Sequence, residues 1–116
     1  MEFVNCYAMA SWMIEDAIEK YGFTWRVLDE AREKLKEICG LINGLMTKFE
    51  AYENTVSVDE TGLLHIRFLC PEIVIDDAES GVFFTVVRNA ASVFIKKDAP
   101  DGEAISVEFC FAINGD

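Results

Sequence analysis

A chain of 116 residues is long enough for one domain core, and its 52% hydrophobic and 27% charged residues, with seven Gly and two Pro, exclude a disordered tail. A net charge of −11 repels nucleic acid and anionic membrane surfaces, so direct binding to either is not expected. No apolar run approaches the roughly 20 residues that span a bilayer, the N-terminus lacks a basic leader, and the four cysteines form no CxxC pair. We therefore expect a single domain over residues 1–116, located in the cytoplasm, with reduced and buried thiols.

The first predicted element is a helix that begins near Tyr7. Its apolar residues step by three and four positions, and Gly22 stands where the helix would end. The residues of this stripe are Tyr7, Ala10, Ile14, Ala17 and Tyr21.

A second helix is predicted from Trp25 to Tyr52, with Thr24 as its N-cap. Such a helix would be about 42 Å long at 1.5 Å per residue, whereas a compact domain of this size is only about 35 Å across. Gly40 and Gly44 each cost about 1 kcal/mol in a helix interior. The helix therefore either bends or breaks near these glycines, or it runs straight and pairs with a second copy in a homodimer. Its heptad-like seam consists of Leu28, Ala31, Leu35, Ile38, Ile42, Leu45, Phe49 and Tyr52.

After Asn54 the apolar residues alternate with a period of two, which predicts strands. One hairpin is expected around Glu60 to Gly62, and Pro71 should interrupt the sheet before a short strand at 73–75. Residues 81–91 fit either a strand or a helix, and their β-branched and aromatic content favours a strand.

The last predicted hairpin joins a strand at 92–97 to a strand at 104–112. The second of these strands is expected to have one core face and one solvent face. The core face would carry Ile105, Val107, Phe109 and Phe111, and the solvent face Ser106, Glu108 and Cys110.

These elements predict an α+β fold, with two N-terminal helices packed on one face of an antiparallel sheet of about five strands. The seam of the second helix is expected to meet the apolar row of the hairpin strands. This row consists of Leu64, Ile66, Phe68, Ile105, Val107, Phe109 and Phe111.

Residues suited to catalysis or metal binding are sparse in the sequence. His65 is the only histidine, so a zinc site of the common kinds is not expected, and a Cys-His pair would need a cysteine to fold close to it. Neither acidic cluster, at 76–79 or at 98–103, has the ligand spacing of a calcium loop, so both are interpreted as solvated turns. No catalytic residue, metal or cofactor is predicted.

The most suggestive feature is Trp12, which falls opposite Ile14 on the first predicted helix, among Glu15, Asp16 and Glu19. Tryptophan is common at the centres of protein interfaces, and an acidic surround suits a basic partner. Two simpler interpretations compete: another part of the chain covers Trp12, and the acidity serves only solubility.

The leading functional hypothesis is a non-catalytic, acidic protein-binding module of the inhibitor, adaptor or chaperone type. Trp12, Glu15, Asp16 and Glu19 would engage a basic partner surface. The alternatives are a structural homo-oligomer built on the long helix, and a small-molecule or metal-binding domain or minor enzyme with its pocket between helix and sheet.

Overall fold

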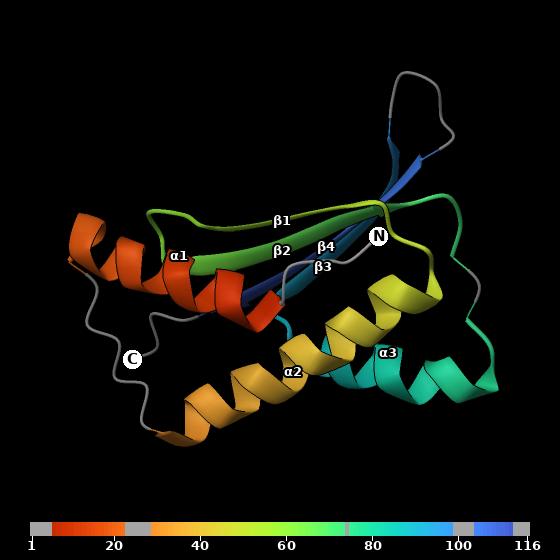
Figure 1. Cartoon of the computed structure of the whole chain (residues 1–116), viewed down its shortest axis with the longest axis horizontal. Helices are drawn as coiled ribbons and strands as arrows, with labels where there is room; N and C mark the ends of the chain where they lie inside the picture. The colour runs from red at the N-terminus through yellow and green to blue at the C-terminus, as the bar shows by residue number, and fades with distance from the viewer. Residues whose placement is uncertain (1–5, 23–28, 74, 99–103, 113–116) are drawn as a thin grey trace.

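In the part of the chain that the computed structural model describes, three helices lie on one side of a four-stranded antiparallel sheet (Figure 1). The structure describes residues 6–22, 29–73, 75–98 and 104–112, and it leaves the side chains at 29–32, 77–79 and 98 undescribed. In chain order the elements are α1 (Cys6–Tyr21), α2 (Asp29–Lys48), β1 (Glu53–Val58), β2 (Leu63–Cys70), α3 (Asp77–Asn89), β3 (Ser92–Asp98) and β4 (Ala104–Ala112).

The sheet has the strand order β1-β2-β4-β3, and each strand is antiparallel to its neighbours. Two sequential hairpins, β1–β2 and β3–β4, are joined through the central pair β2–β4, in which Ile66 lies opposite Phe109. The α+β class and the antiparallel sheet are thus confirmed. The prediction of five strands is wrong for the described residues, because Ile73 and Ile75 lie outside the sheet and Val74 is not described.

The strand predicted within residues 81–91 is also wrong, because residues 77–89 form helix α3. Phe83 and Val86, three positions apart, are buried, while Phe84 between them is 59% exposed. Side-chain hydrogen bonds to carbonyls one turn earlier accompany this helix, from Thr85 Oγ1 to Gly81 O at 2.7 Å and from Asn89 Nδ2 to Thr85 O at 2.8 Å. Burial against the core therefore outweighs the β propensity of the individual residues.

Helix α1 agrees closely with the sequence prediction. Its buried residues Cys6, Ala10, Ile14 and Ala17 follow the expected three-and-four spacing. Gly22 ends the helix with a φ of 73°, and its N–H donates to the Ile18 carbonyl at 2.9 Å. A positive φ of this size is a C-terminal cap geometry that favours glycine.

Helix α2 runs without interruption through Gly40 and Gly44, so it does not break at them. Its 20 residues correspond to about 30 Å at 1.5 Å per residue, which fits within the 39 Å long axis of the molecule. The helix ends at Lys48 rather than at Tyr52, because Glu50 adopts a φ of 56° and the Ala51 N–H returns to the Met46 carbonyl at 2.9 Å. The predicted start at Trp25 and the Thr24 cap lie outside the described residues.

The middle of the predicted seam of α2 lies in the core, whereas Tyr52 at its end is 44% exposed and the side chains of Leu28 and Ala31 are not described. Leu35, Ile38, Ile42, Leu45 and Phe49 are all buried in one apolar cluster with the inner row of the sheet. Phe49 stacks on Phe68 of β2 with ring centroids 6.5 Å apart. The backbone of α2, however, lies next to α1 and α3 rather than next to the strands, whereas α1 lies next to both α2 and β1. Because these seam side chains are buried within one copy, the seam is not available to pair with a second copy. Homodimerisation itself stays a prediction, which light scattering after size-exclusion chromatography would test.

Gly22, which ends α1, should respond to alanine substitution in the opposite direction from Gly40 and Gly44, which lie inside α2. Gly22→Ala should destabilise the fold by about 1 kcal/mol, because a Cβ disfavours a positive φ. Gly40→Ala and Gly44→Ala should each stabilise it by roughly 0.5–1 kcal/mol, since a Cβ there meets nothing within 4 Å and alanine suits a helix interior better. Urea unfolding monitored by circular dichroism measures all three. Destabilisation by Gly40→Ala or Gly44→Ala would mean that another surface occupies this side of α2.

The two faces of the sheet differ in what covers them. The inner face, which carries Leu64, Ile66 and Phe68, packs beneath the helices. No described helix lies on the outer face (Figure 1). None of the described helices combines the length and apolar character needed to cross a membrane.

Candidate functional site

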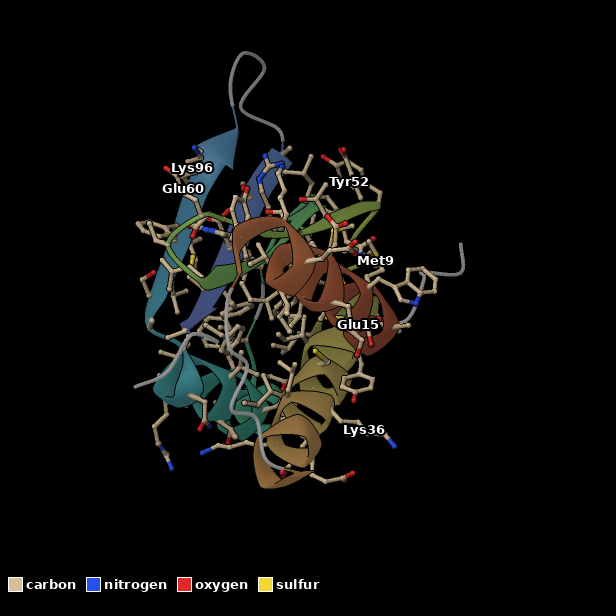
Figure 2. All side chains as sticks on the ribbon, turned by 90° about the vertical axis from the view of Figure 1, so that its left-hand side faces the viewer. Met9, Glu15, Lys36, Tyr52, Glu60 and Lys96 are labelled. Atoms are coloured by element: carbon tan, nitrogen blue, oxygen red, sulfur yellow. The ribbon has the colours of Figure 1, made fainter. Side chains whose placement is uncertain are left out.

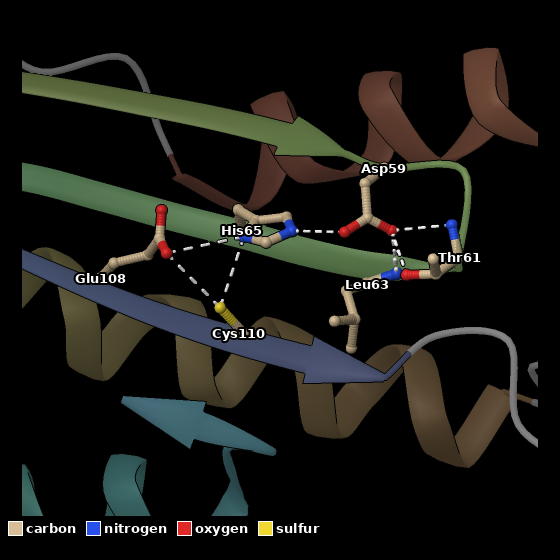
Figure 3. Close-up of polar contacts among 6 residues, drawn as sticks. All are labelled: Asp59, Thr61, Leu63, His65, Glu108 and Cys110. Carbon is tan, nitrogen blue, oxygen red and sulfur yellow. Dashed lines mark hydrogen bonds and ion pairs between the residues drawn. The ribbon is translucent and has the colours of Figure 1, made fainter. Parts of the chain in front are cut away.

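His65 lies on the outer face of β2, directly opposite Cys110 of β4. Its Nδ1 lies 3.3 Å from the Cys110 Sγ and 3.7 Å from the Glu108 Oε2 (Figure 3). The Cys110 Sγ and the Glu108 Oε2 are themselves 3.7 Å apart. One imidazole nitrogen, one thiol and one carboxylate oxygen thus converge on the central strand pair.

Asp59, the first residue of the β1–β2 turn, holds the other side of the imidazole. Its Oδ2 lies 2.7 Å from the His65 Nε2, while its Oδ1 accepts hydrogen bonds from the backbone N–H groups of Thr61 at 2.9 Å and Leu63 at 3.1 Å. In the neutral imidazole the Asp59 carboxylate places the proton on Nε2, and the Nδ1 lone pair is then directed at Cys110 and Glu108 (Figure 3).

The electrostatics of the cluster oppose thiolate formation. Burial is the main cause that raises the pKa of the Cys110 thiol. A hydrogen bond with Ser92 lowers this pKa by less, and the Glu108 carboxylate raises it again. Burial alone would also raise the pKa of Asp59, but hydrogen bonds from His65, Thr61 and Leu63 outweigh this and hold it well below its usual range. Asp59 is thus a carboxylate and Cys110 a neutral thiol at neutral pH, so the Cys-His-Asp arrangement lacks the activated thiolate of a nucleophile.

The outer face of β4 is less exposed than the sequence predicts. Ser106 and Cys110 are only 2% and 1% exposed, and the predicted solvent face is wrong for them. The Arg67 Nε donates to the Ser106 Oγ at 2.8 Å, so long side chains of the neighbouring strand lie over the small ones. The side chains of His65 and Glu108 remain 25% and 28% exposed, which leaves the cluster open to solvent on one side.

The four residues predicted to bind a partner all lie on the outside of α1. Trp12 is 63% exposed, so the described protein does not cover it. Glu15, Asp16 and Glu19 are exposed on the same helix, and Figure 2 labels Glu15 at the edge of α1 that is nearest to α2 in that view. The face is therefore arranged as the helical periodicity predicts, and its partner-binding role stays a prediction.

Most of the acidic side chains in the two clusters, at 76–79 and 98–103, lie outside the described residues. Asp76 is exposed, and the side chains of Asp77 and Glu79 are outside the described set. The acids at 98–103 also lie outside it. All four cysteines are free and buried, as the composition predicts.

Comparisons with protein-family models, with curated proteins and with solved structures found no match for this chain.

The sequence prediction missed the convergence of His65, Glu108 and Cys110. Strand parity places Glu108 and Cys110 on one face of their strand, and His65 on the outer face of its own strand. Strand parity does not reveal that β2 and β4 are neighbours or that His65 lies directly opposite Cys110, and the sequence prediction lacked this information.

Proposed function

We propose that the protein is a non-catalytic binding module, of the inhibitor, adaptor or chaperone type, that engages a basic surface of a protein partner through the outer face of α1. The observation that supports this proposal is the 63% exposure of Trp12 on a helix whose other outward residues include three acids.

A solvent-exposed indole is costly, since it leaves a large apolar ring in water. Met13 beside it is also 37% exposed, so the helix presents a small apolar centre. Glu15, Asp16 and Glu19 surround that centre with negative charge. An apolar anchor with a charged rim is the usual anatomy of a protein interface, and the sign of the rim selects a basic partner.

The net charge of −11 supports the same choice of partner. It would steer a basic protein toward this chain over a distance of about one Debye length, roughly 8 Å at physiological salt. Binding should consequently weaken as salt is added.

The test compares capture of partners from the native host by the unaltered chain, by Trp12→Ala, and by a triple variant with Glu15→Lys, Asp16→Lys and Glu19→Lys, with mass spectrometry as the readout. Trp12→Ala should weaken capture at least tenfold, as expected for loss of an interface hot spot worth about 2 kcal/mol. The charge reversal should weaken it further and reduce its salt dependence.

Two matched variants control for general effects of the substitutions. Phe94→Ala removes an aromatic ring that is 54% exposed on β3, and Glu33→Lys with Glu37→Lys reverses exposed charges on α2. Both should leave capture unchanged. If the α1 variants retain every partner of the unaltered chain, the α1 face has no part in the interaction.

A further inference from the structure

The geometry points to a second site, independent of the α1 face: we propose that His65, Glu108 and Cys110 bind a divalent metal ion of the zinc type on the outer face of the sheet. His65 contributes Nδ1, Glu108 a carboxylate oxygen and Cys110 its sulfur. Asp59 orients the imidazole and is not itself a ligand.

The separations of the three donor atoms match a tetrahedral ion. Zinc bonds of about 2.3 Å to sulfur and 2.0–2.2 Å to nitrogen and oxygen place tetrahedral ligand atoms about 3.3–3.6 Å from one another. The separations here are 3.3 Å for Nδ1 and Sγ, 3.7 Å for Nδ1 and Oε2, and 3.7 Å for Sγ and Oε2. Shifts of a few tenths of an ångström in two side chains would complete the coordination.

The imidazole is already in the tautomer that a metal requires. Asp59 accepts from Nε2 at 2.7 Å, so the lone pair is on Nδ1, the atom that faces Cys110 and Glu108. A carboxylate on the far nitrogen of a ligating histidine is a recurrent feature of metal sites, because it fixes the ring and makes it a stronger donor. The hydrogen bonds from Thr61 and Leu63 to the other oxygen hold Asp59 in place.

A metal also accounts for the chemical make-up of the cluster better than a nucleophile does. A catalytic cysteine needs a cationic neighbour that stabilises its thiolate, whereas Cys110 has the Glu108 carboxylate 3.7 Å away. Sulfur, carboxylate and a neutral imidazole nitrogen all offer lone pairs to the same point, and a cation bound there would satisfy all three. Zinc accepts this mixture of donors, while calcium and magnesium prefer oxygen alone.

The exposure of the three ligand side chains indicates a metal site that is open to solvent on one side. Three protein ligands leave one tetrahedral position for water or a small exchangeable ligand. The partial exposure of His65 and Glu108 directs that position toward solvent, whereas Cys110 is 1% exposed and lies beneath them. The site lies on the outer face of the sheet and not between helix and sheet, where the sequence hypothesis placed a pocket.

The test uses Co²⁺ as a spectroscopic probe for the 116-residue chain under reducing conditions. Addition of Co²⁺ should produce a near-ultraviolet thiolate-to-cobalt charge-transfer band that saturates at one equivalent, and Zn²⁺ should displace it. No charge-transfer band at millimolar Co²⁺ in the unaltered chain would overturn the proposal without any variant.

Variants then identify the ligands. His65→Gln, Glu108→Gln and Cys110→Ser should each weaken binding of Zn²⁺ at least 100-fold in calorimetry. Asp59→Asn should weaken it 10- to 100-fold, because its amide would donate to Nε2 and shift the imidazole proton to Nδ1. Cys70→Ser and Glu53→Gln, a buried thiol and an exposed acid elsewhere on the sheet, should bind Zn²⁺ as the unaltered chain does.

A thermal melt of the unaltered chain gives a readout that does not depend on variants folding. Zn²⁺ should raise the Tm, since an ion that binds only the folded state stabilises it. A charge-transfer band that survives Cys110→Ser but is lost in Cys70→Ser, or an unchanged Tm at saturating Zn²⁺, would contradict the assignment.

Discussion

Phe109→Ala should destabilise the protein by about 3–5 kcal/mol, one of the largest effects expected of a single truncation in this chain. Phe109 is fully buried at the middle of β4, and its ring lies 6.4 Å from that of Phe68 on β2 and 6.1 Å from that of Phe83 on α3. Alanine would leave a cavity where the central strands meet a helix, and it would remove both aromatic contacts. Urea unfolding measured by fluorescence or circular dichroism gives the difference in free energy.

Phe94 provides the matched control for this truncation. It lies opposite Glu108, one residue before Phe109 on β4, and its side chain is 54% exposed. Phe94→Ala should therefore cost less than about 1 kcal/mol. Equal losses for the two variants would contradict the assignment of the inner face of the sheet as the core.

Val86→Lys and Phe84→Lys should differ strongly, and this pair tests whether residues 77–89 form a helix. Val86 is fully buried and Phe84 is 59% exposed, because positions two apart on a helix point in different directions. Val86→Lys should cost roughly 4 kcal/mol or prevent folding, since it buries an unpaired charge. Phe84→Lys should change stability by no more than about 0.5 kcal/mol.

A strand would instead place Phe84 and Val86 on the same face, so the two substitutions would have similar effects on stability. Denaturant midpoints of both variants, compared with the unaltered chain, distinguish the two structures. Equal destabilisation by the two substitutions would support a strand, which the residue composition favours, over the helix.

The sequence predicts α1 well and residues 81–91 poorly, for identifiable reasons. The apolar stripe of α1 has one period over its whole length, and a glycine marks its end. Residues 81–91 are compatible with both periods, so the decision depends on what they pack against. In the structure Phe83 contacts Phe109, a residue far away in the sequence. A local rule of propensity cannot include that contact.

The two candidate sites also differ in whether local sequence patterns can predict them. The outward position of Trp12 follows from helical periodicity alone and agrees with its exposure. The cluster of His65, Glu108 and Cys110 depends on the pairing of two strands that belong to different hairpins. Parity gives the face of each residue, but only the strand order and register bring them into contact.

That strand order has a consequence for the order of folding events. The hairpins β1–β2 and β3–β4 are local in sequence, whereas the β2–β4 pair that joins them closes a long loop containing α3. Loop closure makes such non-local pairing slow, so we expect it to limit the folding rate. His65 and Cys110 face each other only after this step, and a metal ion between them would cross-link the two hairpins and slow their separation during unfolding.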